Sequence, residues 1–251
     1  MRGWGRKVGG YAAATAMLLA VWELGSLVVG SPALPGPVPA IRDFVTAFVS
    51  DMLPHLGVSA WRVVASMVLG AALAAPLGLA VGRAPRVDAV AGPLLFLTYP
   101  IPKVVFLPVL LVLLGIGDAP KIALITMIVF FQILVTARDA ARGIPTSAVL
   151  SVRSLGATRW QVYRHVVVPA ALPDIFTALR ISTGTAIAVL FFSETIAGTD
   201  GLGWYIIDAW TRIAYSEMFA GIIAMALLGV ALYEALDLAE ARVCRWTRAG
   251  R

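Results

Sequence analysis

The chain alternates between long apolar stretches and short polar segments. Residues 63–82, for example, contain no charged side chain. A helix of about 20 apolar residues crosses the hydrocarbon core of a bilayer. Some uncharged cores here are shorter, so we expect their flanking Lys, Arg and Glu side chains to snorkel to the interface. The pattern predicts an all-α integral membrane protein with six transmembrane helices, over residues 8–29, 57–82, 88–114, 121–137, 173–197 and 217–238.

The third predicted span, residues 88–114, contains four internal prolines and Lys103. A charge inside the membrane is a functional hypothesis by default, and an ammonium that faces a pathway would suit an anionic substrate. The alternative is that the helix breaks at Pro100 and Pro102, so that Lys103 reaches water or the headgroups. The sequence leaves both interpretations open.

Composition agrees with the membrane assignment, because 60% of the residues are hydrophobic and only 14% are charged. The basic residues lie in short segments between apolar runs, an arrangement that reflects topology rather than nucleic-acid binding. With a cytoplasmic N-terminus, the outer segments and outer span ends hold only Arg42, Arg62, Lys121 and Arg212. The inner segments then hold Arg2, Arg6, Lys7, Arg83, Arg86, Arg138, Arg142, Arg153, Arg159, Arg164, Arg242, Arg245, Arg248 and Arg251. This distribution predicts that both termini are cytoplasmic.

The first span is an addition to a five-helix core. It is followed by a proline-rich exit over residues 31–39 and by a predicted amphipathic surface helix over residues 40–53. A cleaved signal peptide is the alternative for residues 8–29, although the apolar run is longer than a usual signal-peptide core. We therefore divide the chain into an N-terminal segment (1–56), a core (57–240) and a basic cytoplasmic tail (241–251).

A polar insert of about 35 residues, 138–172, separates the fourth and fifth spans and is cytoplasmic by the charge rule. Apolar residues recur at helical spacing on both sides of Gly156, as Val149, Val152 and Leu155 before it and Trp160, Tyr163 and Val167 after it. We expect two short helices at an angle, the second ended by Pro169 and Pro173. From the residues alone, an ordinary interfacial helix explains the insert equally well.

The chain has no motif for catalysis or metal binding. No segment matches G-x-x-x-x-G-K-[ST], so a phosphate-binding loop of its own is not expected. His55 and His165 are far apart in the predicted topology, and the single cysteine, Cys244, can complete neither a disulfide nor a metal cluster. We predict that the chain is not an enzyme, holds no cofactor or metal, and draws its energy from another polypeptide or from an ion gradient.

The segment Arg153-Ser-Leu-Gly-Ala-Thr-Arg-Trp160, followed by Val168-Pro-Ala-Ala-Leu-Pro173, resembles the coupling motif of the membrane subunits of bacterial ABC importers. Further matches are Tyr99-Pro-Ile-Pro-Lys103, Gly115-Ile-Gly-Asp118, Ser193-Glu-Thr-Ile196, Gly201-Leu-Gly203 and Phe219-Ala-Gly-Ile-Ile223. Together they are similar to the nitrate/sulfonate/taurine branch of binding-protein-dependent permeases. The resemblance extends from the second span to the end of the chain.

The resemblance implies a bacterial inner-membrane permease subunit that pairs with a second copy of itself. Two ATPase subunits, which bind ATP and Mg²⁺, would dock on the cytoplasmic loops, and an extracytoplasmic binding protein would deliver a small solute. The implied coupling residues are Arg153, Ser154, Leu155, Gly156, Ala157, Thr158, Arg159, Arg164 and Pro173. One departure is Leu150, which stands six positions before Gly156 where the family usually has an acidic residue.

Candidate pathway residues besides Lys103 are Ser182, Thr183, Thr185 and Glu194 in the fifth span. Close helix packing also explains small polar residues, and a paired carboxylate also explains Glu194. Residues 198–203 predict a turn, with Trp204 and Tyr205 as interfacial anchors.

Three interpretations are weighed: an ABC permease for a small anion or a pyrimidine-type solute, an ion-driven secondary transporter, and a membrane scaffold. Against the second stand the missing inverted repeat and the scarcity of carboxylates in the spans.

Overall fold

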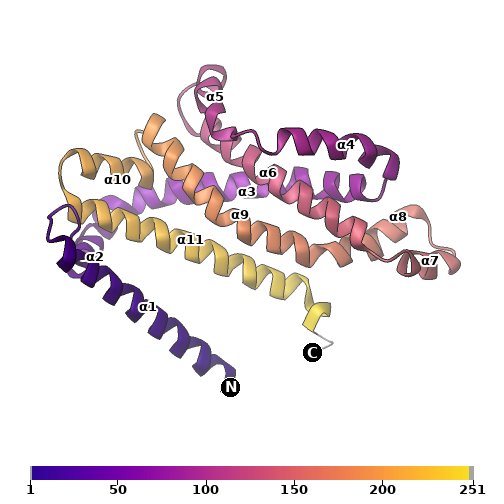
Figure 1. The fold of residues 1–251 in the computed structure, drawn as a ribbon, viewed down its shortest axis with the longest axis horizontal. Helices are drawn as coiled ribbons and strands as arrows, with labels where there is room; N and C mark the ends of the chain where they lie inside the picture. The colour runs from indigo at the N-terminus through magenta and orange to yellow at the C-terminus, as the bar shows by residue number, and fades with distance from the viewer. Residues whose placement is uncertain (1, 249–251) are drawn as a thin grey trace. The chain divides into compact units, whose positions relative to one another are not determined.

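A computed structural model describes residues 2–248. The chain divides into two compact units: Met1–Val58 with Thr199–Ala226 (unit 1), and Ser59–Gly198 with Leu227–Arg251 (unit 2). The described residues are helical, with no strand among them. Figure 1 shows the order of the helices along the chain.

Unit 1 contains α1 (Arg2–Val29), α2 (Pro37–Ala47), the π-helix η1 (Phe48–Met52), α10 (Leu202–Thr211) and the beginning of α11 (Tyr215–Val243). Unit 2 contains most of α3 (Leu53–Gly82), α4 (Pro85–Thr98), the 3₁₀ turn η2 (Lys103–Phe106), α5 (Leu107–Leu114), α6 (Asp118–Gly143), α7 (Thr146–Ser154), α8 (Arg159–Val162), the π-helix η3 (Tyr163–Val167), α9 (Val168–Ala197), the end of α11 and η4 (Arg245–Arg248).

The membrane spans agree with the sequence prediction. Among the described residues, five helical runs are long and apolar enough to cross a bilayer, and a sixth arises if the bent pair α4 and α5 is counted as one span. That pair is bent by 80° at residues 99–102, where Pro100 and Pro102 cannot donate the backbone hydrogen bonds of a continuous helix. The predicted all-α, six-span fold is confirmed.

Two helix boundaries differ from the prediction. The surface helix expected over residues 40–53 is continuous with the second span, since α2, η1 and α3 follow one another without a break from Pro37 to Gly82. The second coupling helix is likewise continuous with the fifth span, from Arg159 to Ala197. Pro169 does not end it, because this proline lies in the first turn of α9, directly after the π-helical turn, where an amide donor is dispensable. Pro173 is accommodated inside α9.

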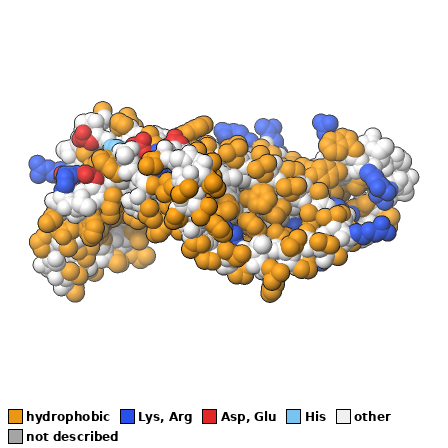
Figure 2. All heavy atoms as spheres, turned by 90° about the horizontal axis from the view of Figure 1, so that it is seen from above, with side chains coloured by type: hydrophobic (Ala, Val, Ile, Leu, Met, Phe, Trp, Pro, Cys, Tyr) orange, Lys and Arg blue, Asp and Glu red, His pale blue; other side chains and the backbone are white. Residues whose placement is uncertain are grey.

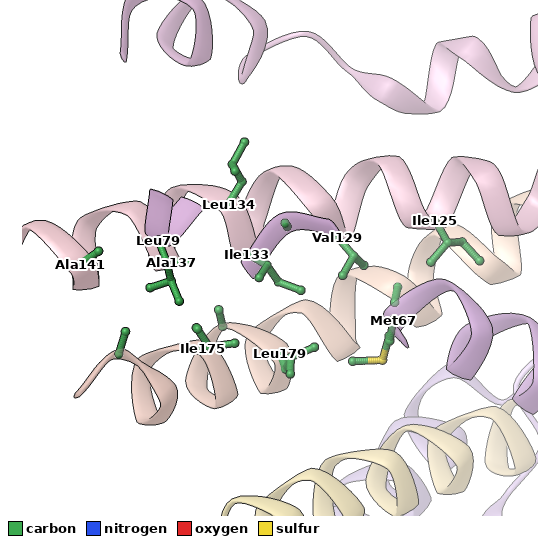
Figure 3. Close-up of a cluster of buried hydrophobic side chains, with 14 of the residues drawn as sticks. Met67, Leu79, Ile125, Val129, Ile133, Leu134, Ala137, Ala141, Ile175 and Leu179 are labelled. Carbon is green, nitrogen blue, oxygen red and sulfur yellow. The ribbon is translucent and has the colours of Figure 1, made fainter. Parts of the chain in front are cut away.

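The core of unit 2 forms where α3, α6 and α9 pack together (Figure 3). On α3, small residues recur every fourth position as Ser66, Gly70, Ala74, Gly78 and Gly82, which lets two helix backbones approach closely. A Cβ atom at Gly78 would lie 2.6 Å from the carbonyl oxygen of Leu134 and 2.8 Å from the Cβ of Ala137, both on α6. The small side chains on this face of α3 therefore determine how closely α3 packs against α6.

In unit 1, the proline-rich exit is bound back to α1. Trp22 Nε1 donates a hydrogen bond to the carbonyl of Pro35 (2.9 Å), and Ser26 Oγ donates one to that of Leu34 (2.9 Å). The Trp22 ring stacks on Phe219, with 5.4 Å between centroids. These contacts fasten the C-terminal half of α1 to the rest of unit 1.

The turn before α10 lies against the beginning of α3. The amide of Gly201 donates to His55 Nδ1 (3.1 Å), and the His55 ring packs on Trp204 and Tyr205. Tyr205 is buried, so the expectation that it anchors the protein at the membrane interface is wrong. It fills the space left by the missing side chain of Gly221, where a Cβ would lie 2.9 Å from its ring.

Most of the remaining surface is apolar, and hydrophobic side chains cover much of the face shown in Figure 2. On α1, the side chains of Leu18, Val21 and Leu27 are all more than 60% exposed. In a bilayer such side chains contact lipid, so their exposure agrees with the membrane assignment.

Candidate functional site

The segment that joins α6 to α9 bends at Gly156, between α7 and α8. The amide of Gly156 donates to the carbonyl of Arg153 (2.9 Å), and the amide of Ala157 donates to that of Val152 (3.4 Å). This pair of hydrogen bonds is the Schellman motif that ends a helix. The motif requires that its first donor, here Gly156, has the left-handed conformation. Gly156 has φ +85°, which only glycine adopts without steric cost. The predicted division into two helices at Gly156 therefore follows from the backbone conformation of this glycine.

The next helix starts two residues after the bend, with reciprocal hydrogen bonds. Thr158 Oγ1 accepts from the amide of Gln161 (3.3 Å), while the amide of Thr158 donates to Gln161 Oε1 (2.8 Å). This capping box satisfies two donors that a helix start otherwise leaves unpaired. The end of one helix and the start of the next are thus both specified locally, which makes the bend a defined angle rather than a loose loop.

Apolar side chains fix this segment to the core of unit 2. Val149, Val162 and Val167 are buried, and Ala157 is half-buried against the same cluster. In contrast, Leu150, Leu155 and Trp160 are 58%, 87% and 66% exposed. The helical spacing that predicted one apolar face on each helix holds for Val149 and Val167, which are buried, and for Tyr163, which packs half-buried against the same cluster. Leu155 and Trp160 face outward because the bend at Gly156 changes the direction of the chain between them.

The predicted coupling residues form one exposed patch around this bend. Arg153, Ser154, Leu155, Gly156, Thr158, Arg159 and Arg164 are all exposed, and Ala157 is half-buried beneath them. Among the described residues, Arg153, Arg159 and Arg164 form no ion pair. We call this set, with Leu150 and Trp160, the coupling patch. Pro173 lies apart from it, inside α9, where its carbonyl accepts a hydrogen bond from Thr177.

Lys103 lies at the break between α4 and α5. Its ammonium donates to the carbonyls of Thr98 (3.1 Å) and Tyr99 (2.6 Å), at the C-terminal end of α4. Its Nζ is also 4.5 Å from the centroid of the Phe131 ring. A cation at a helix C-terminus is stabilised by the unpaired carbonyls there. The structure thus gives Lys103 local partners at the break that its neighbouring prolines produce.

Ser182 and Thr183 are buried on α9, whereas Thr185 is half-buried. Thr183 Oγ1 donates to the carbonyl of Leu179 (3.0 Å), and Thr185 Oγ1 accepts from Gln132 Nε2 on α6 (3.3 Å). The Ser182 hydroxyl is buried and has no hydrogen-bond partner among the described residues. Of these three candidates, Thr185 therefore lies at the contact of α9 with α6, and Thr183 lies beside Met67 of α3.

Glu194 belongs to a buried cluster of charged and polar side chains that joins three helices. Arg62 Nη1 on α3 donates to Glu194 Oε1 on α9 (2.7 Å), and Ser59 Oγ donates to the same carboxylate (2.9 Å). The Arg62 guanidinium also contacts Asp118 Oδ1 in the first turn of α6, at 2.6 Å from Nη2. Lys121 is buried three residues after Asp118. We call Ser59, Arg62, Asp118 and Glu194 the Arg62 cluster.

Arg62 and Lys121 were missed as site residues, since the charge count assigned them to the outer ends of spans. Both are 1% exposed. One signal was present in the sequence: Arg62, Asp118 and Glu194 each stand at one end of an apolar run, with opposite charges. The motifs Gly115-Ile-Gly-Asp118 and Ser193-Glu-Thr-Ile196, 75 positions apart, meet at this arginine.

Further ion pairs fasten unit 2 internally. Arg138 on α6 binds Asp88 in the first turn of α4, and Arg142 contacts the same carboxylate (3.2 Å). Arg180 on α9 binds Glu240 near the end of α11. The broken span and the last span are thus each tied by an arginine to a helix of the core.

These features define a multi-span, all-α membrane protein with a rigid, positively charged bend between two of its spans. The chain belongs to the family described as "Binding-protein-dependent transport system inner membrane component", whose family model matches residues 66–245. It is therefore a permease, the multi-pass inner-membrane component of an ABC importer, as the resemblance of its motifs implied.

Three similar proteins illustrate the branch. The taurine transport system permease protein TauC of Escherichia coli K12 is 31% identical over 239 residues, with 92% of this chain and 87% of that protein covered. The putative aliphatic sulfonates transport permease protein SsuC of Bacillus subtilis 168 is 29% identical over 234 residues, covering 92% and 85%. The formylaminopyrimidine transport permease protein ThiX of Halalkalibacterium halodurans is 25% identical over 233 residues, covering 92% and 93%.

Two solved structures share the fold. A permease chain of the inward-facing MetNI methionine ABC transporter has a TM-score of 0.62 at 24% identity, covering 77% of this chain and 94% of that chain. A chain of the bacterial alginate ABC transporter, solved with its alginate pentasaccharide-bound periplasmic protein, has a TM-score of 0.63 at 18% identity, covering 97% and 99%. At these identities the similarity concerns the fold.

Proposed function

We propose that two copies of this chain form the translocation pathway of an ATP-driven importer for a small anionic solute, a sulfonate such as taurine. An extracytoplasmic binding protein delivers the solute, and two ATPase subunits supply the energy by binding the coupling patch. The sulfonate class is supported by the similarity to taurine and aliphatic sulfonate permeases. A pyrimidine-type solute is the second candidate, favoured by the similarity to a formylaminopyrimidine permease.

The observation that carries the coupling proposal is the defined bend at Gly156, which presents unpaired arginines and exposed apolar side chains together. The exposure of Leu155 and Trp160 to water is unfavourable in free energy, so the patch favours a partner that covers these two side chains. Arg153, Arg159 and Arg164 add a requirement for acidic groups on that partner. Leu150, which replaces the usual acidic residue, adds to the exposed apolar area. The partner surface therefore combines an apolar groove with an acidic rim.

The bend is also connected to the membrane by a single rigid element. The helical run that starts at Arg159 continues to Ala197, so a movement of the patch moves the whole fifth span. ATP binding by the partner would then favour one of two arrangements of the spans by binding it more tightly. ATP and Mg²⁺ belong to the ATPase subunits in this proposal, and this chain performs no catalysis and holds no cofactor of its own.

Three assignments complete the proposal. Both termini are cytoplasmic in this proposal, which the distribution of basic residues supports. The N-terminal segment (1–56) is retained, which the contacts of Trp22 with Pro35 and Phe219 support. The core (57–240) forms the pathway, and the tail (241–251) stays in the cytoplasm. Fusions of a reporter active only in the cytoplasm to residue 1 and to residue 251 test the orientation, and activity of both is expected.

Substitutions of Gly156 test the coupling patch. A Cβ atom at Gly156 would have no neighbour within 4 Å in this chain, so a side chain there meets only the partner. Gly156→Asn and Gly156→Ala then cost only the left-handed backbone conformation, roughly 1–2 kcal/mol for alanine and less for asparagine. Gly156→Leu carries the same backbone cost but also enters the partner surface. We expect ATP-dependent uptake into proteoliposomes to survive in the Asn and Ala variants and to fall at least about tenfold in the Leu variant.

The result is read at equal insertion of all three variants into the membrane. Equal uptake by the Leu and Asn variants would show that nothing covers Gly156 and would remove the coupling assignment. The substrate is tested separately, by measuring whether the purified binding protein of the same transporter binds taurine, an alkanesulfonate or an aminopyrimidine. Binding of the aminopyrimidine alone would replace the sulfonate proposal by the second candidate.

A further inference from the structure

The two carboxylates that share Arg62 differ in their exposure. Glu194 is completely buried, and Ser59 holds both of its oxygens, at 2.9 and 3.0 Å. Asp118, by contrast, has a side chain that is 44% exposed, although it lies 2.6 Å from the same guanidinium. Separating a buried pair leaves a charge without compensation, whereas a half-exposed carboxylate exchanges its partner for water at little cost. Within the Arg62 cluster, the contact of Arg62 with Glu194 is therefore the permanent one, and its contact with Asp118 is the one that can open.

The side that can open is built to move. Asp118 begins α6, directly after Gly115 and Gly117, which have φ +78° and +148°. These glycines join α5 to α6 in conformations that other residues rarely adopt, and neither would meet a neighbour within 4 Å if it carried a Cβ. Because Asp118 is in the first turn of α6, the helix dipole stabilises its charge even without Arg62. After release, the Asp118 charge thus stays stabilised by the helix and by water, and Arg62 keeps its buried contact with Glu194.

The permanent side is connected to the coupling patch. Glu194 lies near the end of the helical run Arg159–Ala197, whose first residue belongs to the patch. This run of 39 residues consists of α8, η3 and α9, which follow one another with no non-helical residue between them. A displacement at its start therefore reaches Glu194, and through Glu194 it reaches Arg62 on α3.

We propose that Arg62 and Asp118 form a latch that fastens α6 to the pair of α3 and α9 in the resting transporter and opens when ATP binding moves α9. Arg62 and Asp118 are positioning residues, since they act through the helices that they join. This inference rests on the ATP-driven import proposed above.

The test uses the complete transporter, with its ATPase and binding protein, in proteoliposomes. Asp118→Asn removes the charge of the contact that opens and keeps the buried pair of Arg62 with Glu194. We expect ATP hydrolysis in the absence of binding protein to rise roughly three- to tenfold, and the solute imported per ATP to fall by a similar factor. Asp118→Glu, which keeps the charge, should restore both values towards those of the native protein.

The matched control is Asp139→Asn, the same substitution in the same helix. Its carboxylate is 60% exposed and contacts Arg138 at 3.3 Å, away from the Arg62 cluster. We expect native hydrolysis and uptake from this control. A second readout is salt, which screens a half-exposed ion pair. Raising the ionic strength should increase the basal hydrolysis of the native protein more than that of the Asn variant.

Three outcomes overturn the latch. The first is an Asn variant that imports and hydrolyses like the native transporter. The second is an equal effect of the Asp139 control. The third is an Asn variant that fails to assemble, which would show a structural role. A native transporter without any ATP-dependent uptake would instead contradict the proposed function, so the two failures are distinguishable.

Discussion

The Glu194 carboxylate and the Arg62 guanidinium lie 2.7 Å apart, and both side chains are almost completely removed from solvent. Pairs of this kind add little to stability compared with apolar residues, but the loss of one partner is costly because the other charge stays buried. We expect Glu194→Ala to lower the free energy of unfolding by about 3–5 kcal/mol. The midpoint of thermal unfolding in detergent and the amount of protein in the membrane should both fall.

The control for this prediction is an exposed pair. Glu217 contacts Arg212 at 2.8 Å, with side chains that are 41% and 49% exposed. Solvent and salt weaken such a contact to about 0–1 kcal/mol, so Glu217→Ala should leave the midpoint nearly unchanged. Similar midpoints for the two variants would contradict the assignment of Glu194 to a buried, stabilising cluster.

The contact between α3 and α6 at Gly78 gives the second prediction. A Cβ at this position would overlap the backbone of Leu134 and the side chain of Ala137, and backbone atoms cannot move aside. We expect Gly78→Ala to cost about 1–3 kcal/mol and Gly78→Leu to prevent stable insertion. Gly184→Ala is the matched control, because a Cβ at Gly184, also inside a helix, would have no neighbour within 4 Å. Its midpoint should stay equal or rise slightly, since alanine favours helix. The measurement is thermal unfolding of the two purified alanine variants, together with the amount of Gly78→Leu protein found in the membrane.

The sequence was sufficient for the number and approximate bounds of the spans, because hydrocarbon thickness and the helical rise set a fixed length of apolar sequence. It also located the bend at Gly156, since a glycine between two helical patterns is typical of a helix end. The prolines 100 and 102 likewise indicated the break beside Lys103, as one of two alternatives. In each case a local rule determines the structure.

What could not be predicted depends on contacts between distant residues. Arg62 looked like the polar flank of a span, because nothing in its neighbourhood reveals that Glu194, 132 positions away, is its partner. The outward orientation of Leu155 and Trp160 was missed for a related reason. Helical spacing predicts which side chains share one face of a helix, but not whether that face packs against the core. Pro169 and Pro173 looked like a helix end because the π-helical turn before them has no signal in the sequence.

Ser182 gives a prediction about the pathway. Its hydroxyl is buried and has no hydrogen-bond partner among the described residues, so its desolvation is not offset by a hydrogen bond. We expect Ser182→Ala to raise the free energy of unfolding by up to about 1–2 kcal/mol, and with it the midpoint of thermal unfolding. Uptake should stay unchanged. A simultaneous loss of uptake, with KM raised and normal assembly, would show that the solute uses this hydroxyl in another state of the transporter. Thr183→Val is the neighbouring control, because Thr183 already donates to Leu179 within its own helix.

The single cysteine provides the last prediction. Cys244 is 1% exposed, and burial, together with the charge of Glu240, raises the pKa of its thiol above the ordinary value of 9.0. The thiolate is the form that reacts with maleimides, so its fraction at pH 7 is small and grows as the pH rises towards the raised pKa. Native protein should therefore label slowly at pH 7 and faster at pH 9.

Leu155→Cys places a thiol at a site that is 87% exposed in the native chain, and this thiol should label rapidly at pH 7 in the isolated permease. Addition of the ATPase subunits should protect it while the slow labelling of Cys244 stays the same. Labelling of Leu155→Cys that is unaffected by the ATPase would contradict docking at the coupling patch.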